Sequence, residues 1–153
     1  MSGKGFESLS WDWGHFNDHN SQQWHDILQL RASVFVVEQN CPYLDPDHKD
    51  PACWHLSVRD QGQLVGTLRA VPPGVSYSDC SIGRVSLNPA WRGRQLGREM
   101  MEQAIAFTQS RWQNPIRISA QAYLQEFYQS LGFVTVRGPY QEDDIPHYEM
   151  VLT

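Results

Sequence analysis

The chain has 153 residues and a mass of 17.6 kDa, which suits one domain and is too short for two of ordinary size. Hydrophobic residues make up 41% and charged residues 19%, which excludes a disordered tail, a coiled coil and a collagen-like fibre. Its 12 Lys and Arg against 17 Asp and Glu give a net charge of -5, so we expect no nucleic-acid partner. We therefore treat residues 1–153 as a single domain.

Two features of the sequence indicate in which cellular compartment the protein is found. The first residues are not followed by the apolar segment of a signal peptide, and no apolar run approaches the ~20 residues that a membrane span needs. Cys41, Cys53 and Cys80 are odd in number and irregularly spaced, which favours reduced thiols over a disulfide framework. We expect a cytoplasmic protein with no membrane partner. The short Cys-x-x-Cys spacing of structural zinc sites is missing, so we also expect no metal.

The first quarter of the chain predicts a strand, a helix and a loop. Bulky and polar residues alternate over residues 11–16, which predicts the strand. Asn20 or Ser21 can cap a helix whose apolar positions run from Trp24 to Phe35. Three prolines and three aspartates interrupt both periodicities over residues 41–51, which predicts the loop.

The middle of the chain predicts three strands in succession. Residues 54–59 and 63–71 are alternating apolar runs, and Asp60-Gln-Gly-Gln between them is typical of a hairpin turn. Residues 82–87 form another apolar run, which Asn88-Pro89 ends.

The last part of the chain alternates helices with strands. Its predicted elements are a helix with apolar positions at Leu96, Met100, Ala104 and Phe107, ended by Asn114-Pro115; a strand over 116–120; a short helix over 124–131, capped by Gly132; and strands over 133–136 and 147–152. The whole order indicates an α+β fold, a mixed α/β sandwich with one central, mostly antiparallel sheet flanked by helices.

A glycine-bearing turn between a strand and the long helix suggests an anion site. Arg92-Gly-Arg-Gln-Leu-Gly97 would point backbone N–H groups at one spot, where the helix N-terminus adds partial positive charge. Arginines in and just after the turn add bidentate hydrogen bonding to phosphate. The spacing matches neither a P-loop nor a dinucleotide-binding glycine motif. An ordinary tight turn with solvated arginines is the alternative interpretation.

Two segments resemble motifs of the GCN5-related N-acetyltransferases (GNAT). Ile82-Gly-Arg-Val-Ser-Leu-Asn-Pro-Ala-Trp-Arg-Gly-Arg-Gln-Leu-Gly97 resembles motif A, and Ala122-Tyr-Leu-Gln-Glu-Phe-Tyr-Gln-Ser-Leu-Gly-Phe133 resembles motif B, in the expected order. The likeness extends from about Trp24 onward to an ElaA-type branch of the superfamily. One position departs from the motif, because Gln95 stands where the family usually has glycine.

The resemblance implies a sheet that splays between residues 82–87 and 116–120, with acetyl-CoA in the gap. It implies that edge groups of Val85 and Leu87 bind the pantetheine arm and that the Leu87 amide polarises the thioester carbonyl. The expected pyrophosphate site comprises Arg92, Gly93, Arg94, Gln95, Leu96, Gly97 and Arg98.

Acetyl transfer to an amine also needs a proton donor and a base. The resemblance implies that Tyr128 protonates the leaving thiolate; a core aromatic is the alternative. The strand over residues 82–87 lacks the family's frequent glutamate, so we predict Glu38 or His147 as base. Acetylation of Cys53 or Cys80 in a ping-pong route is a further alternative.

The leading hypothesis is an acetyl-CoA-dependent N-acetyltransferase that acts on a primary amine of a small molecule or peptide by direct attack. The acidic segments Asp45–Asp50 and Glu142–Asp144 could attract a cationic acceptor or could serve solubility alone. The alternatives are a non-catalytic acyl-CoA-binding module and, last, an interaction module that displays the tryptophans. Many relatives pair, so a homodimer is also implied.

Overall fold

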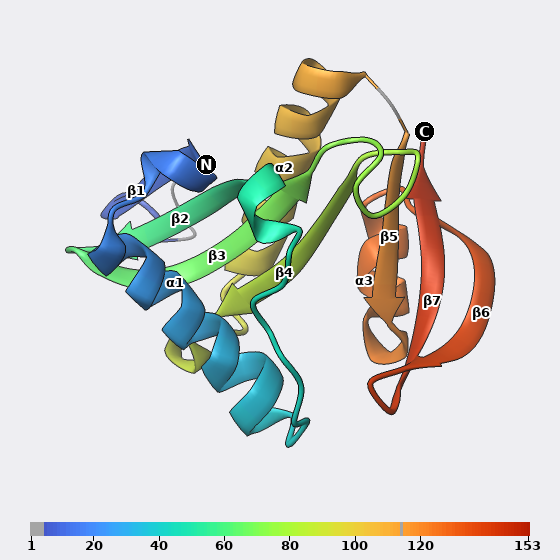
Figure 1. The fold of residues 1–153 in the computed structure, drawn as a ribbon, viewed down its shortest axis with the longest axis horizontal. Helices are drawn as coiled ribbons and strands as arrows, with labels where there is room; N and C mark the ends of the chain where they lie inside the picture. The colour runs from blue at the N-terminus through green and yellow to red at the C-terminus, as the bar shows by residue number, and fades with distance from the viewer. Residues whose placement is uncertain (1–4, 114) are drawn as a thin grey trace.

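The computed structural model describes residues 5–113 and 115–153. In these residues the elements follow the predicted order of strands and helices (Figure 1). Their bounds are β1 (Leu9–His15), α1 (Ser21–Ala32), the π-helical turn η3 (Ser33–Glu38), β2 (Trp54–Asp60), β3 (Gln63–Val71), β4 (Ser81–Leu87), α2 (Leu96–Trp112), β5 (Ile116–Gln121), α3 (Gln125–Ser130), β6 (Val134–Glu142) and β7 (Ile145–Leu152).

The strands form two antiparallel half-sheets, ordered β1-β2-β3-β4 and β5-β7-β6. In the part of the chain that the structure describes, one parallel bridge joins them, between Cys80 and Ile116, where Arg117 donates its backbone N–H to the Cys80 carbonyl at 2.9 Å. From this bridge β4 and β5 run apart (Figure 1). The predicted α+β class and the splay between these two strands are therefore confirmed.

Local backbone geometry shapes the first half-sheet. Gln61 and Gly62 both have positive φ, 50° and 85°, as a tight β2–β3 hairpin requires. In β4 the register against β3 slips, because Thr67 pairs with Ser86 while Arg69 pairs with Gly83, which leaves one extra residue on β4. Such a bulge bends a strand. Arg84 lies in it with a φ of 52°.

Helices cover both faces of this half-sheet. In Figure 1, α1 crosses in front of β3 and β4, and α2 lies behind them. The Asn20 side chain caps α1 by accepting from the Gln23 N–H at 2.8 Å, and the Gln23 side chain accepts from Asn20 N–H in return. Leu96, Met100 and Ala104 of α2 are fully buried, as the predicted apolar stripe requires.

A glycine-ended turn fixes the position of α3. Phe133 N–H donates to the Tyr128 carbonyl at 3.1 Å, and Gly132 N–H donates to the Gln129 carbonyl at 3.0 Å. This is the Schellman arrangement, and the Tyr128 and Phe133 rings complete it with an edge contact at 5.9 Å. Gly132 has a φ of 103°, so the predicted cap is confirmed and Tyr128 is held against the core.

The last hairpin differs from its prediction. Strand β6 runs from Val134 to Glu142 rather than ending at residue 136, and β7 begins at Ile145. The sequence hides the extension because Gly138-Pro139 interrupts the alternation and two register slips break the ladder. Asn114, predicted to end α2 with Pro115, lies outside the described residues.

The loop over residues 41–51 conceals a buried ionic network. Arg31 is 1% exposed and donates to Asp45 at 2.8 Å and to Asp50 at 3.0 Å. Arg69 donates to Asp47 at 2.7 Å and to Asp50 at 2.8 Å. The suggestion that Asp45–Asp50 attracts an acceptor is therefore wrong, because these carboxylates bind internal arginines.

Within residues 5–113 and 115–153, no helix is both long and apolar enough to cross a membrane.

Candidate functional site

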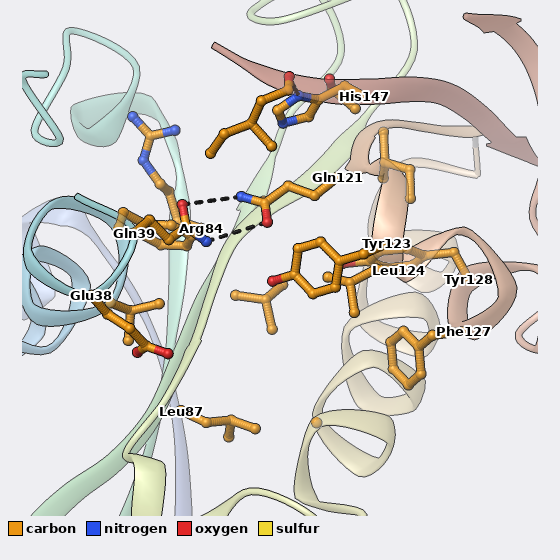
Figure 2. Close-up of a pocket in the computed structure, with 18 of the residues that line it drawn as sticks. Glu38, Gln39, Arg84, Leu87, Gln121, Tyr123, Leu124, Phe127, Tyr128 and His147 are labelled. Atoms are coloured by element: carbon orange, nitrogen blue, oxygen red, sulfur yellow. Dashed lines mark hydrogen bonds between the residues drawn. The ribbon is translucent and has the colours of Figure 1, made fainter. Parts of the chain in front are cut away.

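A cleft of about 810 Å³ opens where β4 and β5 separate. Figure 2 shows Glu38, Gln39 and Leu87 on one side of it and Tyr123, Phe127 and Tyr128 on the other. The first side comes from η3, from Gln39 directly after it and from β4, and the second side follows β5 in the chain. The cleft therefore lies between the two half-sheets, and residues from both sides line it.

The strand β4 presents a free edge to the cleft. Val85 and Leu87 both line it, as predicted. Asn88 donates its backbone N–H to the Val65 carbonyl of β3 at 2.8 Å. Because successive residues of a strand direct their N–H groups to opposite edges, the Leu87 N–H faces away from β3. A ligand in the cleft could accept from it.

The turn before α2 forms one end of the cleft. Gly93 and Gln95 both have left-handed backbones, with φ of 73° and 69°, and they line the cleft together with Gly97 and Arg98. This conformation brings the chain around into the first turn of α2, whose unpaired N–H groups and dipole favour an anion. The turn fits a phosphate-bearing ligand.

The arginines of this turn have different surroundings. Arg94 stacks on Trp91, with its guanidinium 3.9 Å from the ring centroid, and its side chain lies outside the cleft lining. Leu96 is buried in the core, so it can offer an anion only its backbone. Arg98 lines the cleft and donates to the Ser130 hydroxyl. Of the predicted pyrophosphate residues, Arg94 and Leu96 are thus the two whose side chains do not line the cleft.

Arg92 is engaged by Glu38 across the mouth of the turn. Its guanidinium donates to both carboxylate oxygens, at 2.5 and 2.7 Å. This hydrogen bonding lowers the pKa of Glu38 and therefore weakens it as a base. Arg92 would therefore bind a phosphate while its guanidinium is also paired with the Glu38 carboxylate.

Replacing Gln95 with glycine should stabilise the fold. A left-handed backbone costs a residue with a side chain about 1–2 kcal/mol, and glycine avoids that cost at some loss of unfolded-state entropy. We expect the free energy of unfolding to rise by about 0.5–1 kcal/mol, measured by urea denaturation at unchanged slope. Gln103→Gly, in the interior of α2, is the matched control and should lower it by about 1 kcal/mol. A loss of stability in Gln95→Gly would contradict the strain.

Tyr128 lines the cleft from α3. Its side chain is 9% exposed, and its ring makes edge contacts with Phe127 and Phe133 at 5.1 and 5.9 Å. Burial raises the pKa of Tyr128 to about 12, so the phenol stays protonated at neutral pH. Among the described residues its hydroxyl has no hydrogen-bond partner, which leaves it available to a ligand.

His147 lines the cleft at the opposite end from Leu87, the last residue of β4 before the glycine-bearing turn (Figure 2). It is 6% exposed, and its Nδ1 lies 2.7 Å from the Ile145 carbonyl. Because a carbonyl oxygen can only accept, Nδ1 carries the hydrogen in this contact, so in the neutral tautomer Nε2 is the nitrogen with the lone pair. The nearest charged group is Glu142, whose Oε2 lies 3.7 Å from Nε2.

A pair of glutamines crosses the cleft between Glu38 and His147. Gln39 and Gln121 exchange side-chain hydrogen bonds of 3.2 and 3.3 Å, drawn as dashed lines in Figure 2. Gln39 follows η3 and Gln121 ends β5, so the pair ties the segment after α1 and η3 to the second half-sheet. Sequence reasoning missed these residues, because no local pattern marks two glutamines that meet across the fold.

The alternative cysteine nucleophiles lie away from the cleft. Cys53 and Cys80 are both fully buried, and neither lines it. Burial raises the pKa of both thiols, to about 11 for Cys53. The geometry therefore disfavours a ping-pong route through either cysteine.

Comparison with known proteins places this cleft in a family. A model of the "Acetyltransferase (GNAT) domain" matches residues 44–153. The chain is 37% identical over 145 residues to protein ElaA of Escherichia coli, covering 93% of this chain and 95% of that protein. It is also 41% identical over 146 residues to a UPF0039 protein of Synechocystis sp., covering 94% of this chain and 95% of the relative.

The chain belongs to the GNAT acetyltransferase family, in its ElaA-like branch.

Solved structures agree with this GNAT assignment. The crystal structure of an acyl-CoA N-acyltransferase from Pseudomonas aeruginosa superposes with a TM-score of 0.91 at 41% identity, covering 95% of this chain and 100% of that one. The crystal structure of E. coli ElaA gives a TM-score of 0.89 at 36% identity, covering 95% and 99%. The fold and family thus support acyl transfer with an acyl-CoA as cosubstrate.

The residues of this GNAT cleft fit such a cosubstrate. The left-handed turn at Gly93 and Gln95, the start of α2 and Arg98 can receive a pyrophosphate, and the open edge of β4 can receive an amide-bearing arm. The turn, the start of α2 and Arg98 lie together in the chain, so they mark the cofactor end of the cleft.

Proposed function

We propose that the chain transfers an acetyl group from acetyl-CoA to a primary amine of a small molecule or peptide, by direct attack in a ternary complex. The observation that carries this proposal is one open cleft that is lined both by an anion-binding turn and by His147. A cleft open between two half-sheets can hold both reactants at once. Direct attack then needs no protein nucleophile.

The residues along β4 and α3 suit the acyl-transfer step. Acetyl-CoA supplies the acyl group already activated as a thioester. The Leu87 N–H, which points away from β3, is placed to donate to an oxygen that gains negative charge. Tyr128, protonated and unpartnered, is the proton donor of choice for the departing sulfur.

We assign the base role to His147 rather than to Glu38. The amine must lose a proton to become a nucleophile, and the Nε2 lone pair of His147 is free because Nδ1 is engaged by the Ile145 carbonyl. Glu38 is held by two hydrogen bonds from Arg92, which favour its charged form and weaken it as a base. Glu38 then serves to hold the turn through Arg92.

Initial-rate kinetics with purified protein test the proposal. Acetyl-CoA is offered with a panel of alkyl amines, aryl amines and peptides, while free CoA thiol and acetylated product are both measured. We expect amine-dependent thiol release with intersecting double-reciprocal lines, the pattern of a ternary complex. Parallel lines would instead indicate a covalent acetyl-enzyme.

A non-catalytic acyl-CoA-binding module is the second candidate. The observation that favours it is β4 itself, where Arg84 is the single ionisable side chain among Ser81–Leu87. The same preparation separates the two, because calorimetric binding of acetyl-CoA without thiol release for any amine would support the module. Turnover with any amine of the panel would exclude it.

A further inference from the structure

The end of the cleft around His147 carries two carboxylates that no Lys or Arg of the described residues pairs. Glu142 and Asp143, at the β6–β7 turn, both line it. No Lys or Arg of the described residues lies within 4.0 Å of either carboxylate. The arginines nearby are used elsewhere: Arg117 and Arg137 bind Glu149 at 2.7 and 3.1 Å.

Arg84 also lines the cleft, but the buried ionic network neutralises its charge. Its Nε lies 2.9 Å from Asp45 and its Nη2 lies 3.4 Å from Asp47. At the cofactor end Arg92 is likewise paired, with Glu38, so Arg98 and the N-terminus of α2 supply the positive character there. The two ends of the cleft therefore differ in electrostatic character.

The Glu142 carboxylate is held in place at one oxygen, while the other oxygen accepts no hydrogen bond from the described residues. Ser119 donates its hydroxyl to Oε1 at 3.1 Å and lies 2.6 Å from the Tyr140 hydroxyl. The other oxygen, Oε2, faces His147 Nε2 at 3.7 Å, which is too long for a hydrogen bond. His147 is a second, independent sign of a ligand here. Its side chain is buried, with 6% of the residue exposed, and its Nε2 has no hydrogen-bond partner among the described residues.

Two hydrogen-bond acceptors that face one cleft are satisfied by a ligand rich in N–H donors. An ammonium group carries three such donors and a positive charge, so it binds carboxylates through charge-assisted hydrogen bonds. A carboxylate on the acceptor would be repelled by Glu142 and Asp143. The chemistry of this end therefore selects against amino acids and for amines with a cationic tail.

We propose that the acceptor is a short diamine or oligoamine, whose reacting nitrogen meets His147 and whose second ammonium group is held by Glu142 and Asp143. This inference rests on the proposed function, because it names the acceptor class of the same cleft. It assigns Glu142 and Asp143 as specificity-determining residues.

Three acceptors of equal chain length test the inference: 1,4-diaminobutane, butylamine and 4-aminobutyrate. They share the reacting group and differ at the far end, which is cationic, neutral or anionic. We expect kcat/KM for the diamine to exceed that for butylamine by about tenfold or more, the size of one charge-assisted hydrogen bond, with 4-aminobutyrate lowest.

Glu142→Gln should bring the diamine-to-butylamine ratio close to one. The matched control is Glu126→Gln, the same change on an exposed residue of α3 outside the cleft lining, which should keep the wild-type ratio. Equal kcat/KM for diamine and butylamine in the wild type, or an unchanged ratio in Glu142→Gln, would overturn the inference and leave the proposed function standing.

If none of the three acceptors is acetylated, the proposed function fails for alkyl amines, and binding decides the inference separately. Calorimetry then compares 1,4-diaminobutane with butylamine on protein saturated with CoA. Diamine binding that is tenfold tighter in the wild type and not in Glu142→Gln supports the cation site, whereas equal affinities refute it.

Discussion

Replacing Tyr128 with phenylalanine is expected to lower kcat by about 10²- to 10⁴-fold, the range of a lost general acid. Tyr128 lines the cleft, its hydroxyl has no hydrogen-bond partner within residues 5–113 and 115–153, and burial raises its pKa to about 12, so it is a phenol that can donate. The change keeps the ring, and with it the contacts to Phe127 and Phe133. Steady-state rates with acetyl-CoA and the best amine of the panel measure the effect.

Tyr148→Phe is the control for Tyr128→Phe. It removes a hydroxyl from a half-buried tyrosine on β7 that does not line the cleft, so kcat should change by no more than about twofold. Wild-type kcat in Tyr128→Phe would make Tyr128 a core aromatic and move the proton donor elsewhere.

Replacing Asp50 with alanine should cost about 3–5 kcal/mol of unfolding free energy. Asp50 is 4% exposed and accepts from Arg31 and Arg69, so its removal leaves two buried guanidinium groups without a shared counter-charge. Since small domains have roughly 5–15 kcal/mol in total, the loss is large. Urea denaturation at pH 7 measures it. The control is Asp12→Ala, at an exposed position of β1, which should change the free energy of unfolding by no more than about 0.5 kcal/mol.

Acid titration gives a second readout of the same network. Burial raises the pKa of Asp50, but the hydrogen bonds and charges of Arg31 and Arg69 outweigh it and hold the pKa below its ordinary value. A lowered folded-state pKa adds stability above the unfolded value near 4, and that stability is lost as the pH falls further. Asp50→Ala should therefore lose less stability than the wild type between pH 5 and pH 3. An equal loss would contradict the network's part in acid unfolding.

Local signals in the sequence predicted the parts of the fold that depend on neighbouring residues. Asn20 caps α1 through Gln23, three residues on, and Gly132 ends α3 through bonds to residues just before it. The apolar stripe of α2 is visible because helical spacing puts its members on one face. The glycine-bearing turn was visible for the same reason, since its residues are consecutive.

Long-range pairs could not be predicted in this way. Glu38 and Arg92 are 54 residues apart, and Gln39 and Gln121 are 82 apart, so no periodicity connects them. For the same reason the acidic loop at Asp45–Asp50 resembled a solvated surface. Only the fold shows that three arginines from α1, β3 and β4 meet these carboxylates.

The single bridge between Cys80 and Ile116 has a mechanical consequence. Beyond it, among the described residues, no backbone ladder crosses from β4 to β5. The spacing of the half-sheets is therefore held by apolar packing, which has no preferred direction, and by side-chain contacts such as the Gln39–Gln121 pair. A small change in the width of the cleft would therefore break no hydrogen bond between strands, and the Cys80–Ile116 bridge is the backbone contact about which such a change would turn.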